Sequence, residues 1–236
     1  MSGKNPLRVL NDQIISCRKC PRLVAHRERV ARVKRRAFRD DNYWGRPVPG
    51  FGDAHARLLI IGLAPAAHGA NRTGRMFTGD RSGDFLYARL HEAGFASQAE
   101  SHRREDGLRL TDAYITAALR CAPPENKPLP AEIANCRPYL ETELGLLRPR
   151  AVLALGRIAF DGYLRLLRGS GALPPQARFA FRHGASYDLP GLPGARTPAT
   201  RLFAAYHPSQ QNTQTGRVTP DMYRRVLRDI RRYLAT

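Results

Sequence analysis

Four stretches of the chain are almost continuously apolar, which is the pattern of strands that are buried on both faces of a parallel sheet. They cover residues 57–63, 113–119, 151–156 and 201–206. Apolar residues recur at helical spacing near residues 80–94, 130–147, 157–168 and 220–234. Strands that alternate with helices in this way predict an α/β fold. We therefore expect a three-layer α/β/α sandwich around a central, mainly parallel, four-stranded sheet.

The first 50 residues precede the first predicted strand and are basic. Apolar side chains recur among arginines and lysines over residues 21–38, which predicts a cationic amphipathic helix. Residues 44–52 are too rich in glycine and proline for regular structure, and residues 169–200 predict a long irregular connection. The sequence shows no internal repeat, so we expect one domain over residues 1–236 that carries residues 1–50 as an N-terminal arm.

Charge narrows the class of partner. The chain has 39 Lys and Arg against 20 Asp and Glu, a formal net charge of +19 over 236 residues. Such an excess attracts polyanions, of which nucleic acid is the commonest. A GC-rich genome also produces arginine-rich proteins, so charge alone indicates no reaction. No apolar run approaches the roughly 20 residues of a membrane helix, and the N-terminus lacks the apolar region of a secretion signal. We expect a cytoplasmic protein without a membrane partner.

Four cysteines have a spacing that suits a metal centre. Cys17 and Cys20 lie three positions apart, and Cys121 and Cys136 follow about a hundred residues later. Disulfides are rare in a reducing compartment, and four thiolates suit a zinc ion or an iron–sulfur cluster equally well by charge and softness. The wide second spacing favours a cluster modestly. Four unrelated buried thiols are the alternative.

Candidate chemical groups follow the predicted strands, because ligands of parallel sheets bind beyond the carboxyl ends of the strands. Phe77 and Asp80 belong to the long loop after the first strand, Asn126 follows the second, and His207 follows the fourth. The first loop lacks the glycine spacing of a dinucleotide site or a P-loop. Each residue also has an ordinary structural interpretation: a core aromatic, a helix N-cap, a turn asparagine and a structural histidine.

These segments together resemble the family 5 (type B) uracil-DNA glycosylases, which carry a [4Fe–4S] cluster. The resemblance rests on Cys17-x2-Cys20-Pro21, residues 62–69, 72–80, 121–124, Cys136 and residues 206–209. It runs over nearly the whole chain and favours iron–sulfur over zinc. Related glycosylases carry a polar residue in the Leu63-Ala64 position and an asparagine near Ala117 or Ala118. Here these positions are apolar, as in type B members.

The resemblance implies roles for individual residues. It implies that the catalytic residues are Asp80, Asn126 and His207, and that the substrate-binding residues are Phe77, Ala64, Ala66, His68 and Ser209. It implies that the DNA-binding residues are Arg75, Gln210, Gln211, Asn212 and Arg217, and that the cluster ligands are Cys17, Cys20, Cys121 and Cys136.

The activity that the resemblance implies is DNA repair by a monomeric glycosylase in a bacterial-type cytoplasm, associated with the nucleoid. The enzyme would flip out uracil or hypoxanthine, with xanthine and ethenocytosine as further candidates, and hydrolyse the N-glycosidic bond to leave an abasic site. Its substrates would be duplex DNA and single-stranded DNA. Lack of an asparagine that reads the base fits a broad range of bases, because a wrong base then leaves no buried amide unpaired.

Two other classes of protein share part of this pattern. A zinc-dependent nucleobase deaminase needs the motifs H-x-E and P-C-x-x-C, whereas this chain has Cys20-Pro21 in the opposite order and no H-x-E. A non-catalytic nucleic-acid-binding module needs only the charge and the metal centre. Release of free base from damaged DNA separates an enzyme from such a module.

Overall fold

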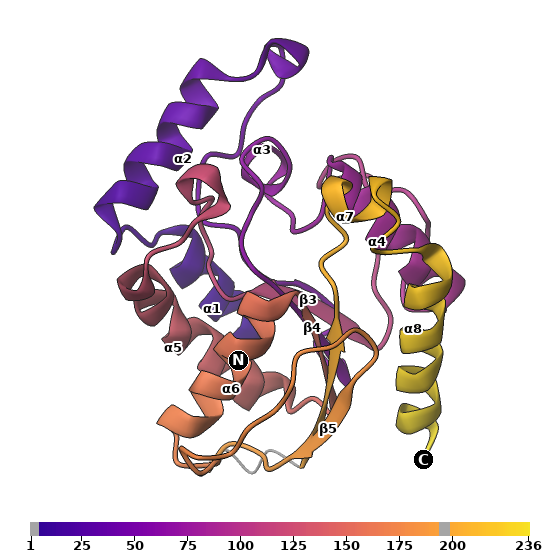
Figure 1. Ribbon diagram of the computed structural model, residues 1–236. Helices are drawn as coiled ribbons and strands as arrows, with labels where there is room; N and C mark the ends of the chain where they lie inside the picture. The colour runs from indigo at the N-terminus through magenta and orange to yellow at the C-terminus, as the bar shows by residue number, and fades with distance from the viewer. Residues whose placement is uncertain (1–4, 194–198) are drawn as a thin grey trace.

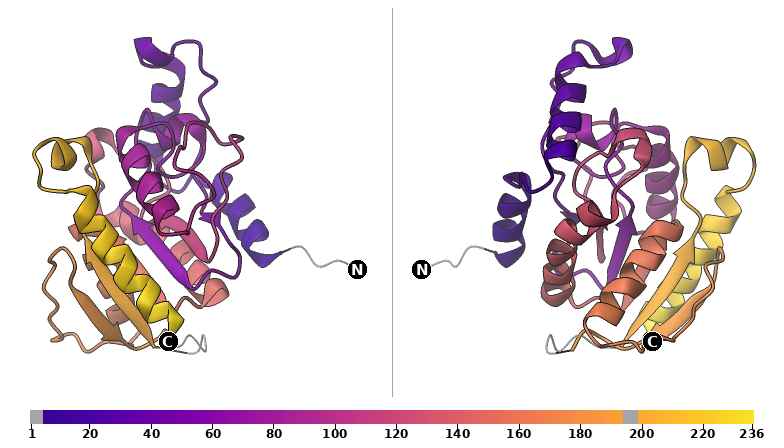
Figure 2. Two further views of the ribbon diagram at one scale, coloured as in Figure 1. Left: turned by 90° about the vertical axis from the view of Figure 1, so that its right-hand side faces the viewer. Right: turned by 60° about the vertical axis from the view of Figure 1, so that its left-hand side comes forward.

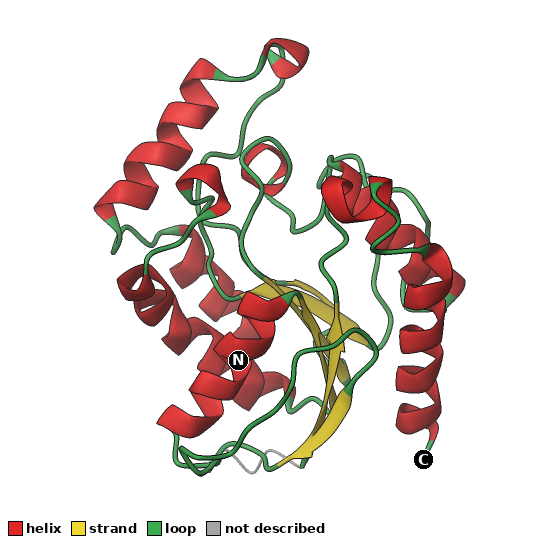
Figure 3. Ribbon diagram, in the orientation of Figure 1, coloured by secondary structure: helices red, strands yellow, loops and turns green. Residues whose placement is uncertain are grey.

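A computed structural model describes residues 5–193 and 199–236, and these form a central six-stranded sheet with the order β1-β3-β2-β4-β6-β5 (Figures 1 and 3). The strands are β1 (Phe51–Gly52), β2 (Leu58–Gly62), β3 (Ala113–Ala117), β4 (Ala151–Leu155), β5 (Ser186–Leu189) and β6 (Thr200–Ala205). Neighbours among β3, β2, β4 and β6 are parallel. The edge strands β1 and β5 are antiparallel to their neighbours.

The four predicted strands are confirmed as the parallel centre of the sheet, whereas both edge strands were missed. β1 has only two residues, too few to give a pattern. β5 reads Ser-Tyr-Asp-Leu and only Leu189 in it is buried, so it carries little apolar signal. The expectation that residues 169–200 are wholly irregular is therefore wrong at β5, and its residues 194–198 lie outside the described part of the chain.

Helices cover both faces of the sheet, which confirms the three-layer sandwich (Figure 1). The helices are α1 (Pro6–Ile15), α2 (Pro21–Val33), η1 (Arg36–Phe38), α3 (Ala70–Thr73), α4 (Arg81–Glu92), η2 (Pro124–Asn126), α5 (Pro130–Leu147), α6 (Arg157–Gly169), α7 (Gln210–Gln214) and α8 (Pro220–Ala235). Over the described residues, no helix combines the length and the apolar character that crossing a bilayer requires.

Side chains of each central strand alternate between the two layers of helices. In β2, Leu58 and Ile60 pack on the side of α4 and α8, and Leu59 and Ile61 pack on the side of α5 and α6. Every residue of β2, β3 and β4 is buried. Burial on both faces explains why these strands read as unbroken apolar runs.

The N-terminal arm contains two helices, and α2 projects beyond the end of the sheet (Figures 1 and 2). The helix predicted over residues 21–38 ends earlier, at Val33. Lys34 adopts a left-handed backbone with φ of 58°, which ends the helix although the basic and apolar pattern continues. A short turn, η1, follows.

Candidate active site

The carboxyl ends of β2, β4 and β6 bring two of the predicted residues together. The ring of Phe77 lies against the Cα of Gly62 at the end of β2, where an added Cβ would sit 3.0 Å from the ring. The same ring lies 5.9 Å from the imidazole of His207, centroid to centroid, at an interplanar angle of 33°. His207 in turn stands beside Gly156, which follows β4. The two glycines leave room for these rings where side chains would fill it.

Phe77 has a backbone conformation that bulky residues rarely adopt. Its φ is 53°, in the left-handed region, although its side chain is only 6% exposed. Its carbonyl packs onto Gly83 in the first turn of α4, so closely that a Cβ there would collide with it. An aromatic residue held in this way indicates a functional site, since the surrounding structure must stabilise the strain.

Asp80 is the N-cap of α4 and also faces the first loop. Its Oδ1 accepts a hydrogen bond of 2.9 Å from the backbone N–H of Gly83. Its Oδ2 lies against Gly69, where a Cβ would collide with the carboxylate. Burial raises the pKa of Asp80, and the backbone N–H groups of Gly83 and Ser82 only partly oppose that rise. Oδ1 therefore acts as the helix N-cap that the sequence also allowed, whereas Oδ2 faces the loop after β2 at Gly69.

His207 is neutral at physiological pH. Burial lowers its pKa to about 4. Its backbone carbonyl accepts a hydrogen bond of 2.8 Å from Asn212 Nδ2, which fixes the start of the segment before α7. A neutral imidazole has one N–H donor and one acceptor nitrogen, so His207 can polarise a carbonyl without carrying a full charge.

Asn126 lies on the segment after β3. It is exposed at the end of η2, and both it and Glu125 have left-handed backbone angles, with φ of 57° and 52°. Its backbone N–H donates to the carbonyl of Pro123 at 3.2 Å. Its side chain makes no polar contact with Phe77, Asp80 or His207 among the described residues. The structure thus brings Phe77 and His207 into contact, while Asp80 lies on the same loop as Phe77 and against Gly69.

The other residues predicted to bind substrate lie on the loop after β2 and at the start of α7. Ala64 packs against the buried group of Leu119 and Cys121. The carbonyl of Ala66 accepts hydrogen bonds from the backbone N–H groups of Gly69 and Asn71. His68 Nδ1 is 2.9 Å from the hydroxyl of Tyr43, and Ser209 caps α7 by accepting from Asn212. These contacts hold the loop after β2 and the start of α7 in place.

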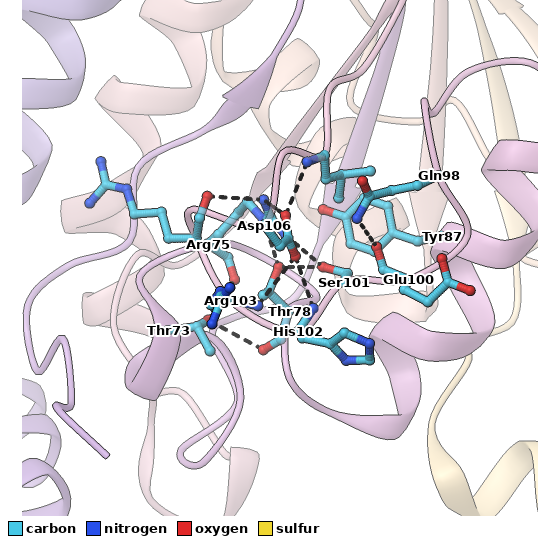
Figure 4. A network of polar contacts seen from close by, with 12 residues as sticks. Thr73, Arg75, Thr78, Tyr87, Gln98, Glu100, Ser101, His102, Arg103 and Asp106 are labelled. Carbon is cyan, nitrogen blue, oxygen red and sulfur yellow. Dashed lines mark hydrogen bonds and ion pairs between the residues drawn. The ribbon is translucent and has the colours of Figure 1, made fainter.

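Arg75 does not have the surface position that a DNA contact requires, so that prediction is corrected (Figure 4). Its side chain is 2% exposed and pairs with Asp106 at 2.6 Å. It also donates to the hydroxyls of Thr78 and Ser101, and its charge is thereby used inside the protein. A basic residue in a basic motif gives no sequence signal that distinguishes a buried ion pair from a phosphate contact.

The remaining residues predicted to bind DNA are accessible or partly so. Gln210 and Gln211 are exposed in the first turn of α7, and Asn212 is half-buried by its hydrogen bond to His207. Arg217 is exposed, and its guanidinium stands over the ring of Tyr206 at 5.1 Å. They lie on the segment that leads away from His207.

The four cysteines line one small cavity between α2, α5 and the segment after β3. The cavity is bordered by Cys17, Cys20, Cys121 and Cys136 together with Arg27 and Arg120. Cys121 and Cys136 are buried, and Cys17 and Cys20 are half-buried, all as free thiols. The fold thus brings Cys17 and Cys20 close to Cys121 and Cys136, more than a hundred positions later in the sequence. The spacing of the cysteines alone did not establish this.

Two buried arginines, Arg27 and Arg120, lie beside the cysteines, whereas burial raises the pKa of the Cys121 and Cys136 thiols. Arg27 is 2% exposed, and its Nη1 donates to Cys121 Sγ at 2.9 Å. Nε of Arg27, and Nε and Nη1 of Arg120, are buried without a hydrogen-bond partner among the described residues. Buried cations normally need a compensating anion, and Arg120 already has one in the buried carboxylate of Glu143. No three His, Cys, Asp or Glu side chains of the described chain are arranged closely enough to hold a single metal ion.

Arg72 is a residue that sequence reasoning missed, and it joins the arm to the loop that carries Asp80. Its Nη1 pairs with Asp41 at 2.6 Å, and its guanidinium stands over the ring of Phe38 at 4.0 Å. Its Nε donates to the carbonyl of His68, and its Nη2 donates to the carbonyl of Gly79, each at 2.8 Å. The Arg72 side chain therefore joins His68, early in the loop after β2, to Gly79, the residue directly before Asp80.

For the activity that the resemblance implies, release of a base from DNA, Arg72→Gln should lower the maximal rate by about a hundredfold, because misplacement of a reacting group by about 1 Å has that effect. The concentration of DNA at half-maximal rate should change little, since Arg72 is directed into the protein. Single-turnover kinetics measures both quantities, and thermal unfolding shows whether the variant is folded. Arg36→Gln, on an exposed arginine of the same arm, is the control. An unchanged maximal rate in a folded Arg72→Gln protein contradicts a positioning role.

The chain is similar to known proteins over most of its length. Residues 49–231 match the profile of the uracil DNA glycosylase superfamily. A Type-5 uracil-DNA glycosylase of Mycobacterium bovis is 53% identical over 232 residues, 98% of this chain and 82% of the relative. The Type-5 uracil-DNA glycosylase of Thermus thermophilus is 53% identical over 220 residues, 93% of this chain and 94% of the relative. That of Pyrobaculum aerophilum is 43% identical over 217 residues, 92% of this chain and 88% of the relative.

Proposed function

Because the chain belongs to the uracil DNA glycosylase superfamily, we propose that it excises uracil and related deaminated bases from DNA by hydrolysis of the N-glycosidic bond. The observation that carries this proposal is the contact between Phe77 and His207 beside Gly62, with Asp80 on the same loop. These groups supply an aromatic face, a neutral hydrogen-bond donor and a carboxylate. A flipped-out nucleotide needs these three partners when its base leaves.

Phe77 and His207 would receive the base in different ways. A base between two parallel rings needs roughly 7 Å between them, twice the ordinary carbon contact, and the two centroids are only 5.9 Å apart. The base would therefore stack on the face of Phe77 and present its edge to His207. As the glycosidic bond lengthens, electrons move to the base, and the neutral imidazole stabilises them through a hydrogen bond to a base carbonyl.

Asp80 would act on the sugar side of the same bond. The sugar becomes positively charged as the base leaves, and an ionised carboxylate stabilises that charge or orients the attacking water. The water oxygen bonds to C1′ as the base departs with the bonding electrons, and the base takes up the proton that the water loses. Since Oδ1 is used for the helix cap, Oδ2 is the oxygen free for this work.

The side chain of Asn126 makes no polar contact with Phe77, Asp80 or His207 in the described part of the chain. Its loop is exposed and has left-handed backbone angles, so it lies at the surface that DNA would approach. In the proposed mechanism its amide adds a hydrogen bond to the base or to the water after DNA binds. The exposed Gln210 and Gln211 in the first turn of α7, and Arg217 beyond that helix, would contact the strands beside the extruded nucleotide.

The range of bases follows from what the pocket lacks. Ala117 and Ala118 are buried apolar residues at the end of β3, where an amide would otherwise read one base. Because no buried amide there is left unpaired by a purine, discrimination against hypoxanthine, xanthine or ethenocytosine should be weak. Duplex DNA with a mispaired base and single-stranded DNA would both serve, since such bases are easily unstacked.

The cysteine cavity would hold the [4Fe–4S] cluster that the resemblance implies. The fit rests on the four thiols around one cavity and on the unpartnered nitrogens of Arg27 and Arg120, which would face an anionic centre. Such a cluster supplies covalent cross-links between segments that are distant in sequence. Cys17 and Cys20 would thereby tie the arm to the segments that carry Cys121 and Cys136, so that arm and sheet act as one unit.

Release of free base tests the proposal directly. Separate duplexes that contain uracil, hypoxanthine, xanthine or ethenocytosine opposite guanine, with an undamaged duplex as the control, are incubated with the protein, and the base released is quantified by mass spectrometry. We expect release of uracil and hypoxanthine, and abasic sites in equal amount. Tight binding without release of any base would favour the non-catalytic nucleic-acid-binding module.

A further inference from the structure

The buried pair of Arg75 and Asp106 fixes the backbone of an exposed loop, residues 101–106 (Figure 4). Besides the ion pair, Asp106 Oδ2 accepts hydrogen bonds from the backbone N–H groups of His102 and Arg103, at 2.9 and 3.2 Å. Arg75 Nη1 donates to the carbonyl of Arg104 at 3.2 Å. Burial raises the pKa of Asp106, but these hydrogen bonds outweigh it and hold the pKa at about 2. The carboxylate is therefore charged at neutral pH.

The loop that this network holds carries two arginines, Arg103 and Arg104, into solvent. His102, Arg103 and Arg104 are all exposed. Within the described part of the chain, the Arg103 side chain has no polar partner, and the Arg104 guanidinium stands over the ring of Trp44 at 4.6 Å. The ring of His102 points away from the network in Figure 4. The buried groups thus bind the backbone of the loop and leave its charges available.

The position of the loop relates it to the candidate active site. The backbone N–H of Gly79 donates to the carbonyl of Ser101 at 2.8 Å, so the loop contacts the residue directly before Asp80. Thr78, next to Phe77, shares a hydrogen bond of 2.7 Å with Ser101. The exposed residues 102–104 follow directly on this contact.

We propose that residues 102–104 form a phosphate-binding loop that holds the DNA strand next to the extruded nucleotide. This inference rests on the proposed function, since it needs DNA at Asp80. Exposed arginines on a loop that is already ordered neutralise phosphates without the loss of conformational freedom that ordering a mobile loop entails. In this proposal, Arg103 and Arg104 contact the DNA, and the buried Arg75 holds the backbone of their loop.

Two substitutions in the loop should have opposite effects. Arg103→Ala removes an exposed cation and should weaken binding roughly tenfold at 0.1 M salt, and should lower the slope of log affinity against log salt by about 1. Glu105 is exposed beside it, so Glu105→Gln removes a repulsive charge and should strengthen binding about twofold. Both residues are exposed, so neither change removes a buried contact.

The control removes an arginine at the other end of the sheet. Arg228 is exposed on α8, whose last turn lies near the start of β2, since the carbonyl of Leu234 accepts from Arg57. Arg228→Ala has the same change of net charge as Arg103→Ala. Binding of a fluorescent undamaged duplex is measured by anisotropy from 50 to 200 mM salt, and single-turnover release of uracil gives the maximal rate.

The expected result is weaker binding and a smaller salt slope for Arg103→Ala, and stronger binding for Glu105→Gln. Arg228→Ala should keep the wild-type affinity, salt slope and maximal rate. Equal effects of Arg103→Ala and Arg228→Ala, or no effect of either, would overturn the loop assignment. If the wild-type protein releases no base, the proposed function fails, and the anisotropy series still decides whether this loop contacts DNA.

Discussion

Asp80→Asn is expected to lower the maximal rate of uracil release by about 10³-fold, because loss of a positioned charge or acid–base group at a reacting bond has effects of that size. Asparagine caps helices as well as aspartate does, so the bond to Gly83 that starts α4 is preserved. DNA affinity should change little. Single-turnover kinetics on a duplex with uracil opposite guanine measures the rate.

The matched control is Asp84→Asn. Asp84 is exposed one turn further along α4, and its loss should change the rate less than about twofold, since exposed charges interact weakly in water. Comparable losses in the two variants would mean that the charge of the helix matters and that Asp80 has no special role. An unchanged rate in Asp80→Asn would remove Asp80 from the mechanism.

The pKa of Asp80 makes two further results part of the same prediction. Because burial raises that pKa, the folded state disfavours the ionised carboxylate, so Asp80→Asn should keep or raise the melting temperature at pH 7. The wild-type rate should fall as the pH drops through the raised pKa, and the variant should lose this limb. Because the pKa of His207 is about 4, its imidazole stays neutral until the pH falls to about 4.

The sequence predicted the parts of this molecule that depend on burial. β2, β3 and β4 are buried throughout and read as apolar runs, so their existence, their parallel arrangement and the three layers followed. The resemblance to the glycosylase family is confirmed by the match over residues 49–231. Edge strands such as β5 escaped prediction because pairing on one side requires little apolar character.

Contacts between distant residues could not be predicted. Arg75 and Arg72 stand three positions apart in one basic motif, yet the first pairs with Asp106 and the second with Asp41. Whether an arginine faces a phosphate or a buried carboxylate depends on which loop the fold brings to it. The same holds for Asn126, whose place relative to His207 depends on the left-handed turn at Glu125 and Asn126.

Cys17→Ala is expected to release the N-terminal arm from the sheet. The group bound by the cysteines would stabilise the contacts it bridges by about 4 kcal/mol if it is held a thousandfold above its dissociation constant. Its loss would therefore increase opening of the arm by up to about a thousandfold. The ion pair of Arg22 with Glu132, at 2.7 Å, and the hydrogen bond from Asn71 to Arg27 would still hold part of the arm. Limited trypsin cleavage measures opening.

Ser16→Ala is the control for this change, because Ser16 is exposed next to Cys17 and bonds only within the turn that ends α1. The wild-type protein and Ser16→Ala should be brown and contain iron and sulfide in equal amounts, whereas Cys17→Ala should lose both colour and protection of the arm. Zinc in the wild-type protein would refute the cluster. If Cys17→Ala lost its iron but its arm stayed protected from trypsin, the direct contacts between α2, α3 and α5 would be sufficient to hold the arm. This result would contradict the proposal that the cluster holds the arm on the sheet.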